Sequence, residues 1–168
     1  MNSIEETSPM YFAVAALISG TIFCVLWLLD SIIHGKIVDD EITGSELQTH
    51  RNILAASLLM EIALVAMYWF PIEALPFFIA FFLTRTAHEF IDELHWHANR
   101  CSQYESMLHL GMWVSILSQT AILFMWGFFS SYNGILALPV YMYVWGAILF
   151  LIMSYTSIIE WNRSSSKS

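Results

Sequence analysis

Basic residues, cysteines and charged residues in general are scarce in this chain. Lys and Arg together number 6 among 168 residues, charged residues make up 12%, and there are 2 cysteines. So few cations give little of the phosphate attraction on which nucleic-acid binding depends. Cys24 lies inside an apolar run and Cys101 in a loop, and two such cysteines do not make the disulfide framework of a small secreted domain. We therefore expect no nucleic-acid partner and no disulfide.

The chain is rich in long hydrophobic runs. Hydrophobic residues make up 58% of it, and its mean hydropathy is +0.63, both outside the range of ordinary soluble domains. A membrane-crossing helix needs about 20 apolar residues. Runs of about this length cover residues 9–33, 53–70, 74–98, 104–129 and 135–159. The sequence therefore predicts an all-α integral membrane protein, with about five transmembrane helices in one bundle and the lipid bilayer as its surroundings.

Turn-forming residues separate these runs. The stretch 71–76, with a proline at each end, predicts a tight turn, and Tyr132-Asn133-Gly134 predicts another. The first run lacks the basic leader of a secretory signal, so we expect it to stay in the mature protein. The bundle then occupies residues 1–163, and the serine-rich residues 164–168 form a short disordered tail.

The basic residues outside the runs all belong to one side of the predicted bundle. They are Lys36, Arg51, Arg100, Arg163 and Lys167. Because cytoplasmic loops carry the excess of Lys and Arg, this pattern predicts an outside N-terminus and a cytoplasmic C-terminus and tail. The expected location is a bacterial cytoplasmic (inner) membrane.

Ionisable side chains within the runs are the strongest functional signal, because such groups are costly in a bilayer and usually mark a site. They concentrate in the half of the bundle that is expected to face the cytoplasm. Glu61, for example, lies about 16 Å along its helix from His50, which stands at the expected cytoplasmic end of that helix. The predicted metal ligands are Asp30, His34, Glu61, His88, Glu89, Asp92, His95, Glu105 and His109. The residues expected to support these ligands are His50, Arg85 and Tyr104. No catalytic residue is assigned.

Helical spacing puts these groups on shared faces. The third run carries two adjacent stripes, His88/Asp92/His95 and Glu89/Glu93/His97. Asp30 with His34 and Glu105 with His109 are four residues apart, so each pair also shares a face. Four helices can thus direct carboxylates and imidazoles into one internal volume, as in metal sites of helical bundles.

This ligand chemistry resembles that of the ferritin-like di-iron carboxylate bundles over about half of the chain. The defining Glu-x-x-His pairs are missing: Asp92-Glu-Leu-His95 is an Asp version, and Glu105-Ser-Met-Leu-His109 has a spacing of four. The histidine boxes of membrane desaturases are also absent. The resemblance implies iron, with a di-iron centre favoured, and zinc or manganese would suit the same ligands.

Several ordinary interpretations compete for the same residues. Ser102-Gln-Tyr-Glu105 has the pattern of a capping box. Arg85 and Glu89 are spaced for a salt bridge within one helix. His50 and His97 lie at the expected membrane interface, where an exposed histidine needs no special role.

Three functional hypotheses follow. The first is a membrane metal protein with redox or oxygen-dependent chemistry on a hydrophobic substrate such as a lipid or a quinol, which would make it a metal-dependent oxidoreductase. The second is a proton or ion pathway, or a small subunit of a respiratory or transport complex. The third is a b-type haem protein, with haem between histidines such as His88 and His109. Whether the chain acts alone, as a homo-oligomer or in a larger membrane complex stays open.

Overall fold

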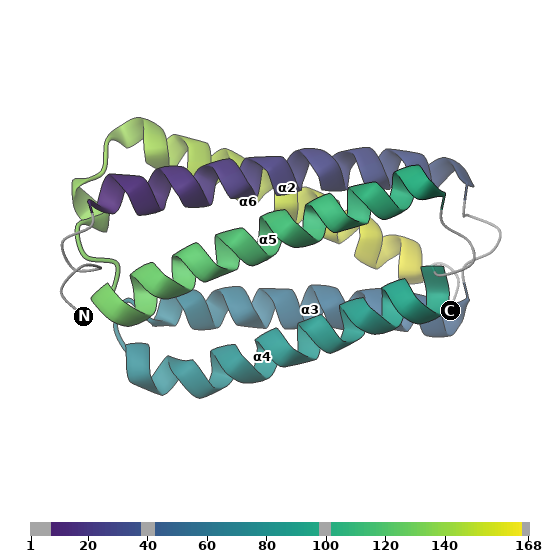
Figure 1. The fold of residues 1–168 in the computed structure, drawn as a ribbon, viewed down its shortest axis with the longest axis horizontal. Helices are drawn as coiled ribbons and strands as arrows, with labels where there is room; N and C mark the ends of the chain where they lie inside the picture. The colour runs from purple at the N-terminus through teal and green to yellow at the C-terminus, as the bar shows by residue number, and fades with distance from the viewer. Residues whose placement is uncertain (1–7, 38–42, 98–101, 166–168) are drawn as a thin grey trace.

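The computed structural model describes residues 8–37, 43–97 and 102–165, and they form an all-helical bundle (Figure 1). The long helices run alongside one another over much of their length. They are α2 (Pro9–Ile37), α3 (Gly44–Ala66), α4 (Pro71–Ile91), α5 (Gln103–Ser130) and α6 (Val140–Ser165). Two short elements complete the chain: the π-helix η1 (Asp92–His97), which continues α4, and the 3-10 turn η2 (Ile135–Ala137).

Four helices are long and apolar enough to cross a membrane. The qualifying stretches are Pro9–Ile32, Pro71–His97, Gln103–Ser130 and Val140–Asn162. The expected all-helical bundle is therefore confirmed. Helix α3, where the sequence predicted a further span, does not meet the same criteria of length and apolarity. Its apolar residues are interrupted by Glu46, Arg51 and Glu61.

Helix α3 begins well before the apolar run that predicted it at residues 53–70. Thr43 caps its N-terminus, and the Thr43 side chain accepts a hydrogen bond from the backbone N–H of Glu46 at 3.3 Å. A capped start lowers the cost of the first helical turn. The extension places Glu46 and His50 on a regular helix next to the end of α4.

The predicted turn across residues 71–76 is wrong. The chain turns earlier, at residues 67–70, and Pro71 is the first residue of α4 while Pro76 lies inside the helix. Proline suits the first helical position, because that position has no backbone hydrogen bond to lose. The second predicted turn is confirmed: Ser131, Tyr132 and Gly134 have positive φ angles of 47°, 55° and 77°.

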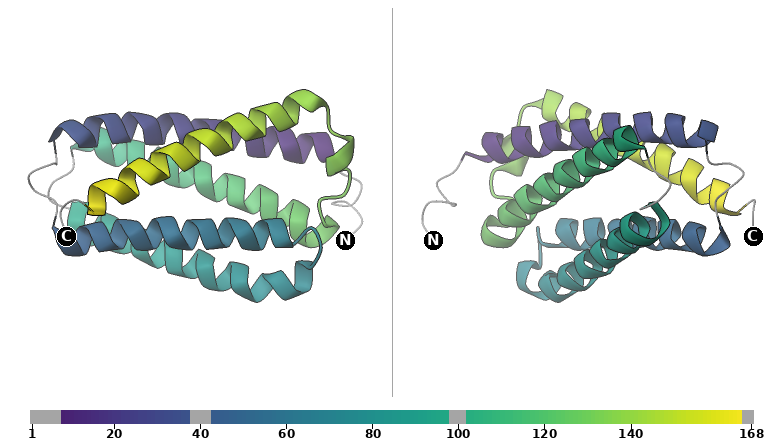
Figure 2. Two further views of the ribbon diagram at one scale, coloured as in Figure 1. Left: turned by 180° about the vertical axis from the view of Figure 1, so that it is seen from behind. Right: turned by 45° about the vertical axis from the view of Figure 1, so that its right-hand side comes forward.

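The helices associate mainly as two pairs. α2 packs along α5, α3 packs along α4, and α6 crosses one face of the bundle to contact α2 and α3, as seen at the front of the left view in Figure 2. Contacts between the two pairs are fewer. Side chains that reach from one pair to the other therefore matter for holding the bundle together.

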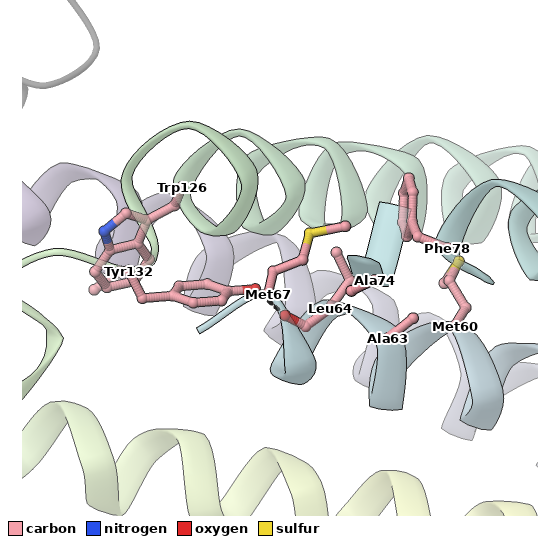
Figure 3. Packing of buried hydrophobic residues seen from close by; sticks show 9 residues of the cluster. Met60, Ala63, Leu64, Met67, Ala74, Phe78, Trp126 and Tyr132 are labelled. Carbon is pink, nitrogen blue, oxygen red and sulfur yellow. Dashed lines mark hydrogen bonds between the residues drawn. The ribbon is translucent and has the colours of Figure 1, made fainter. Parts of the chain in front are cut away.

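One half of the bundle holds the apolar core. It is formed by Ala13, Met60, Ala63, Leu64, Met67, Ala74, Phe78, Trp126 and Tyr132, most of which are shown in Figure 3. The Tyr132 hydroxyl donates a hydrogen bond to the Leu64 carbonyl at 3.0 Å, which satisfies the main polar group in this core. A group of ionisable side chains, including Asp30, Glu46, His50, Asp92 and His109, lies at the other end, where α2 and α6 end and α3 and α5 begin.

Candidate metal centre

The π-helix η1 determines which side chains of its segment face the bundle. In an α-helix, residues five apart point about 140° away from each other. The wider i→i+5 turn of a π-helix brings such residues toward one face, and π-turns are frequent at functional sites. As a result His97 Nδ1 lies 3.8 Å from Asp92 Oδ2, five residues earlier. Glu93, four residues earlier, would share a face with His97 in an α-helix as well, and its Oε2 lies 3.7 Å from the same nitrogen.

A first ligand group consists of Glu46 and His50 from α3 and His97 from η1. One ligand atom from each residue lies within 4.8 Å of the others. His97 Nε2 is 3.8 Å from Glu46 Oε1. Glu46 and His97 are both buried, with 1% and 5% of their surface exposed. Three potential metal ligands thus converge, two of them buried and the third, His50, partly exposed.

A second group consists of Glu93 and His97 from η1 and His109 from α5, again with ligand atoms within 4.8 Å of one another. His109 Nδ1 is 2.9 Å from Glu93 Oε2, and the His97 and His109 rings are 4.9 Å apart. The other His109 nitrogen, Nε2, lies 3.2 Å from Asp30 Oδ1 on α2. This second group joins the two helix pairs.

Asp92 lies between the two groups. Its Oδ1 is 3.0 Å from His50 Nε2, and its Oδ2 faces His97 Nδ1. Burial of His50 acts to lower its pKa, but the hydrogen bond to Asp92 and the charges of Asp92, Glu160 and Glu46 outweigh burial, so the pKa is raised above 6.5. The carboxylates therefore favour a positive charge at this position.

The structure brings some of the predicted site residues into this cluster. Asp30, Asp92 and His109, predicted as ligands, and His50, predicted as a supporting residue, all lie there. Three further members were not among the predicted ligands: Glu46, Glu93 and His97. Glu93 and His97 share the second stripe of their run, and Thr43-Gly-Ser-Glu46 has the capping pattern that marks a helix start.

Glu61 and Glu89 lie in a different environment, around the buried Arg85. Arg85 donates to Glu89 Oε1 in an ion pair, and Trp113 Nε1 donates to Glu89 Oε2 at 2.7 Å. Glu61 also interacts electrostatically with Arg85. We call Glu61, Arg85, Glu89 and Trp113 the arginine cluster; it neighbours the histidine and carboxylate cluster, since the charge of Asp92 also acts on Glu89.

Two of the remaining predicted ligands, His88 and Glu105, have partners outside the cluster. Asn52 Nδ2 is 3.4 Å from His88 Nε2. Glu105 accepts a hydrogen bond from the Ser102 backbone N–H at 2.6 Å, and Ser102 Oγ accepts one from the Glu105 backbone, which completes a capping box.

The last three predicted residues lie away from the cluster or outside the description. His95 is exposed, with its ring 4.5 Å from that of Trp96. Tyr104 is 58% exposed. The side chain of His34 lies outside the described residues.

No protein-family model, curated protein or solved structure matches this chain.

Proposed function

We propose that this protein is an integral membrane protein that binds a transition metal in its histidine and carboxylate cluster. The observation that carries the proposal is the pair of ligand groups centred on His97, one with Glu46 and His50 and the other with Glu93 and His109. These residues come from three separate helical elements. Distant parts of the chain thus present metal-binding atoms to a shared, largely buried region.

The donor set suits a metal of the iron, manganese or zinc type, which takes mixed imidazole and carboxylate ligands. The carboxylates of Glu46, Asp92 and Glu93 lie close to His97, and their mutual repulsion favours a positive charge among them. Imidazoles offset part of this negative charge, and a divalent cation would offset more. The residues at the cluster therefore fit a metal ion.

Membrane insertion of all five long helices agrees with the apolar surface of the bundle. Even α3 exposes a stripe of apolar side chains, with Leu58, Ile62 and Val65 exposed by 61%, 56% and 60%. These positions are four and three residues apart and so share one helix face, which would meet lipid. The positive-inside rule then favours an outside N-terminus and places the metal cluster toward the cytoplasm.

Iron in this centre would supply redox or oxygen-dependent chemistry, and the surrounding bilayer would supply a hydrophobic substrate such as a lipid or a quinol. The role of the chain would be to hold the metal with His50, His97 and His109 and to limit its contact with water. His97 is buried enough to serve that purpose. The corresponding activity is that of a membrane metal-dependent oxidoreductase.

Metal analysis and an absorption spectrum of the full-length protein test this proposal. Cells would be grown with added iron, manganese and zinc, and the protein purified in detergent. We expect at least about one equivalent of a transition metal, and clear loss of metal in Glu46→Gln. Glu73→Gln, which alters an exposed carboxylate at the start of α4, is the matched control and should keep the metal.

Two results would contradict this function. Less than about 0.2 equivalents of every transition metal would argue against a metal centre. A strong Soret band would show haem in place of a carboxylate-bound metal.

A proton or ion pathway is the second candidate, and the arginine cluster favours it. Glu61, Arg85 and Glu89 are ionisable groups within the bundle that belong to neither ligand group, and such groups within spans often relay protons. A pH-driven flux in liposomes that Glu61→Gln abolishes, with metal content unchanged, would favour this function over metal chemistry.

A further inference from the structure

Building on the metal centre proposed above, we infer that it holds two metal ions bridged by the imidazole of His97. The first ion would take Glu46, His50 and His97 as ligands. The second would take Glu93, His109 and the same His97. The shared residue is what distinguishes this arrangement from a single ion in either group.

The two ring nitrogens of His97 face different partners. Nε2 lies 3.8 Å from Glu46 Oε1, whereas Nδ1 lies 3.7 Å from Glu93 Oε2. The lone pairs of these nitrogens leave the ring in different directions, so one imidazole cannot chelate a single ion with both. Using both nitrogens therefore requires an ion on each side of the ring.

Each side of His97 has a carboxylate and a histidine of its own. The ligand atoms of each group lie within 4.8 Å of one another. Ligands bonded at about 2 Å to one ion lie up to about 4 Å apart, so small movements of the side chains would close each group around an ion. Glu46 and His50 share helix α3, while Glu93 and His109 come from η1 and α5.

Two further carboxylates support the pair of ions. Asp92 faces His50 with Oδ1 and His97 with Oδ2, so it can contact both sides of the centre. Asp30 accepts from His109 Nε2 at 3.2 Å, which leaves Nδ1 of His109 directed at Glu93 as a metal ligand. A carboxylate behind a ligating histidine fixes its tautomer and orientation, so Asp30 is a positioning residue.

Formation of the bridge involves a proton and no electron transfer. A neutral imidazole carries one ring proton and has one nitrogen lone pair for a metal. The first metal–nitrogen bond uses that lone pair. The second forms at the other nitrogen as its N–H bond breaks and the proton leaves to solvent, and the resulting imidazolate donates to both ions.

Cobalt(II) loading of the full-length protein in lipid nanodiscs tests the bridge. After chelation, the wild type should bind two equivalents of cobalt with an exchange-coupled magnetic resonance spectrum. Glu46→Gln and Glu93→Gln should each remove one equivalent and the coupling. His97→Gln should weaken binding at both sides by about tenfold or more. His95→Gln changes an exposed histidine of the same π-helix and should bind like the wild type.

The possible outcomes distinguish failure of the His97 bridge from failure of the metal centre itself. One equivalent in the wild type, or two uncoupled ions, would overturn the bridge and leave a metal centre. Retention of both ions in His97→Gln would also overturn it. If His97→Gln does not fold, the two glutamine variants decide, because retention of both ions in each would overturn the assignment. No cobalt binding at all would instead overturn the proposed function.

Discussion

His109 on α5 contacts Asp30 on α2 through Nε2, which lies 3.2 Å from Asp30 Oδ1. The other nitrogen of the same ring lies 2.9 Å from Glu93 Oε2 in η1, the continuation of α4. A single imidazole therefore joins the α2/α5 pair to the α3/α4 pair. Because contacts between these pairs are otherwise fewer than within them, the polar cluster has a structural role as well as a proposed chemical one.

Metal binding should stabilise the whole bundle, since the ligands come from both helix pairs. A ligand that binds only the folded state at 100 times its dissociation constant adds about 2.7 kcal/mol. We expect a higher melting temperature with cobalt than with chelator. The unfolding is measured by tryptophan fluorescence in detergent. His109→Gln should reduce the increase, and Glu73→Gln should leave it unchanged. Equal melting temperatures with and without metal would contradict this prediction.

The pH dependence of stability should differ between the metal-free and metal-bound protein. His50 has a folded-state pKa raised above 6.5, so its protonation stabilises the metal-free fold below pH 6.5, and this stabilisation is lost as the pH rises through the raised value. Metal competes with the same proton, so metal affinity should rise over that range.

Melting temperatures of both forms, measured from about pH 6 to about pH 9, check this dependence. The comparison of wild type with His50→Asn isolates the histidine, because the variant lacks the titrating group. The stability difference between metal-free wild type and the variant should shrink as the pH rises. A difference that grows with pH would show that the sign is wrong.

Removal of the arginine charge should destabilise the protein strongly. Arg85 is 3% exposed and is paired with Glu89. Arg85→Met leaves a buried carboxylate uncompensated, and breaking a buried pair from one side costs about 3–5 kcal/mol. The double variant Arg85→Met/Glu89→Gln should recover the part of this loss that Glu89 causes, as measured by denaturant unfolding in detergent, while Glu61 still lacks the opposite charge of Arg85. If the single variant is as stable as the double variant, the charge pair contributes little.

Gly134 should tolerate a side chain poorly, because it has a φ of 77° and an added Cβ would lie 2.6 Å from Pro9 Cγ. Strain of this kind costs about 1–3 kcal/mol. Gly134→Ala should therefore lower the free energy of unfolding by about that amount. Gly44→Ala is the matched control, since a Cβ added at Gly44 would have nothing within 4 Å, and it should change stability by no more than about 0.5 kcal/mol. Equal effects of the two changes would contradict the role of the turn.

Local sequence patterns predicted the helices well but their ends less well. Apolar length predicted the run at 104–129, which the structure has as Gln103–Ser130. The start of α3 lay in polar sequence, so hydropathy missed it, although the Thr43-Gly-Ser-Glu46 pattern was present. Two prolines indicated a turn, yet Pro71 begins a helix, because the adjoining chain had already turned.

The sequence by itself determined an all-helical chain with apolar helices of membrane-crossing length and ionisable residues at one end, because composition and periodicity are properties of each segment alone. Which ionisable residues meet was decided only by tertiary structure. A π-turn brings His97 toward Asp92, and α3 starts early enough to bring Glu46 beside His97, whereas His95 is exposed. Both outcomes depend on how neighbouring helices pack, since a change of one hydrogen-bond register rotates a side chain by a large part of a turn.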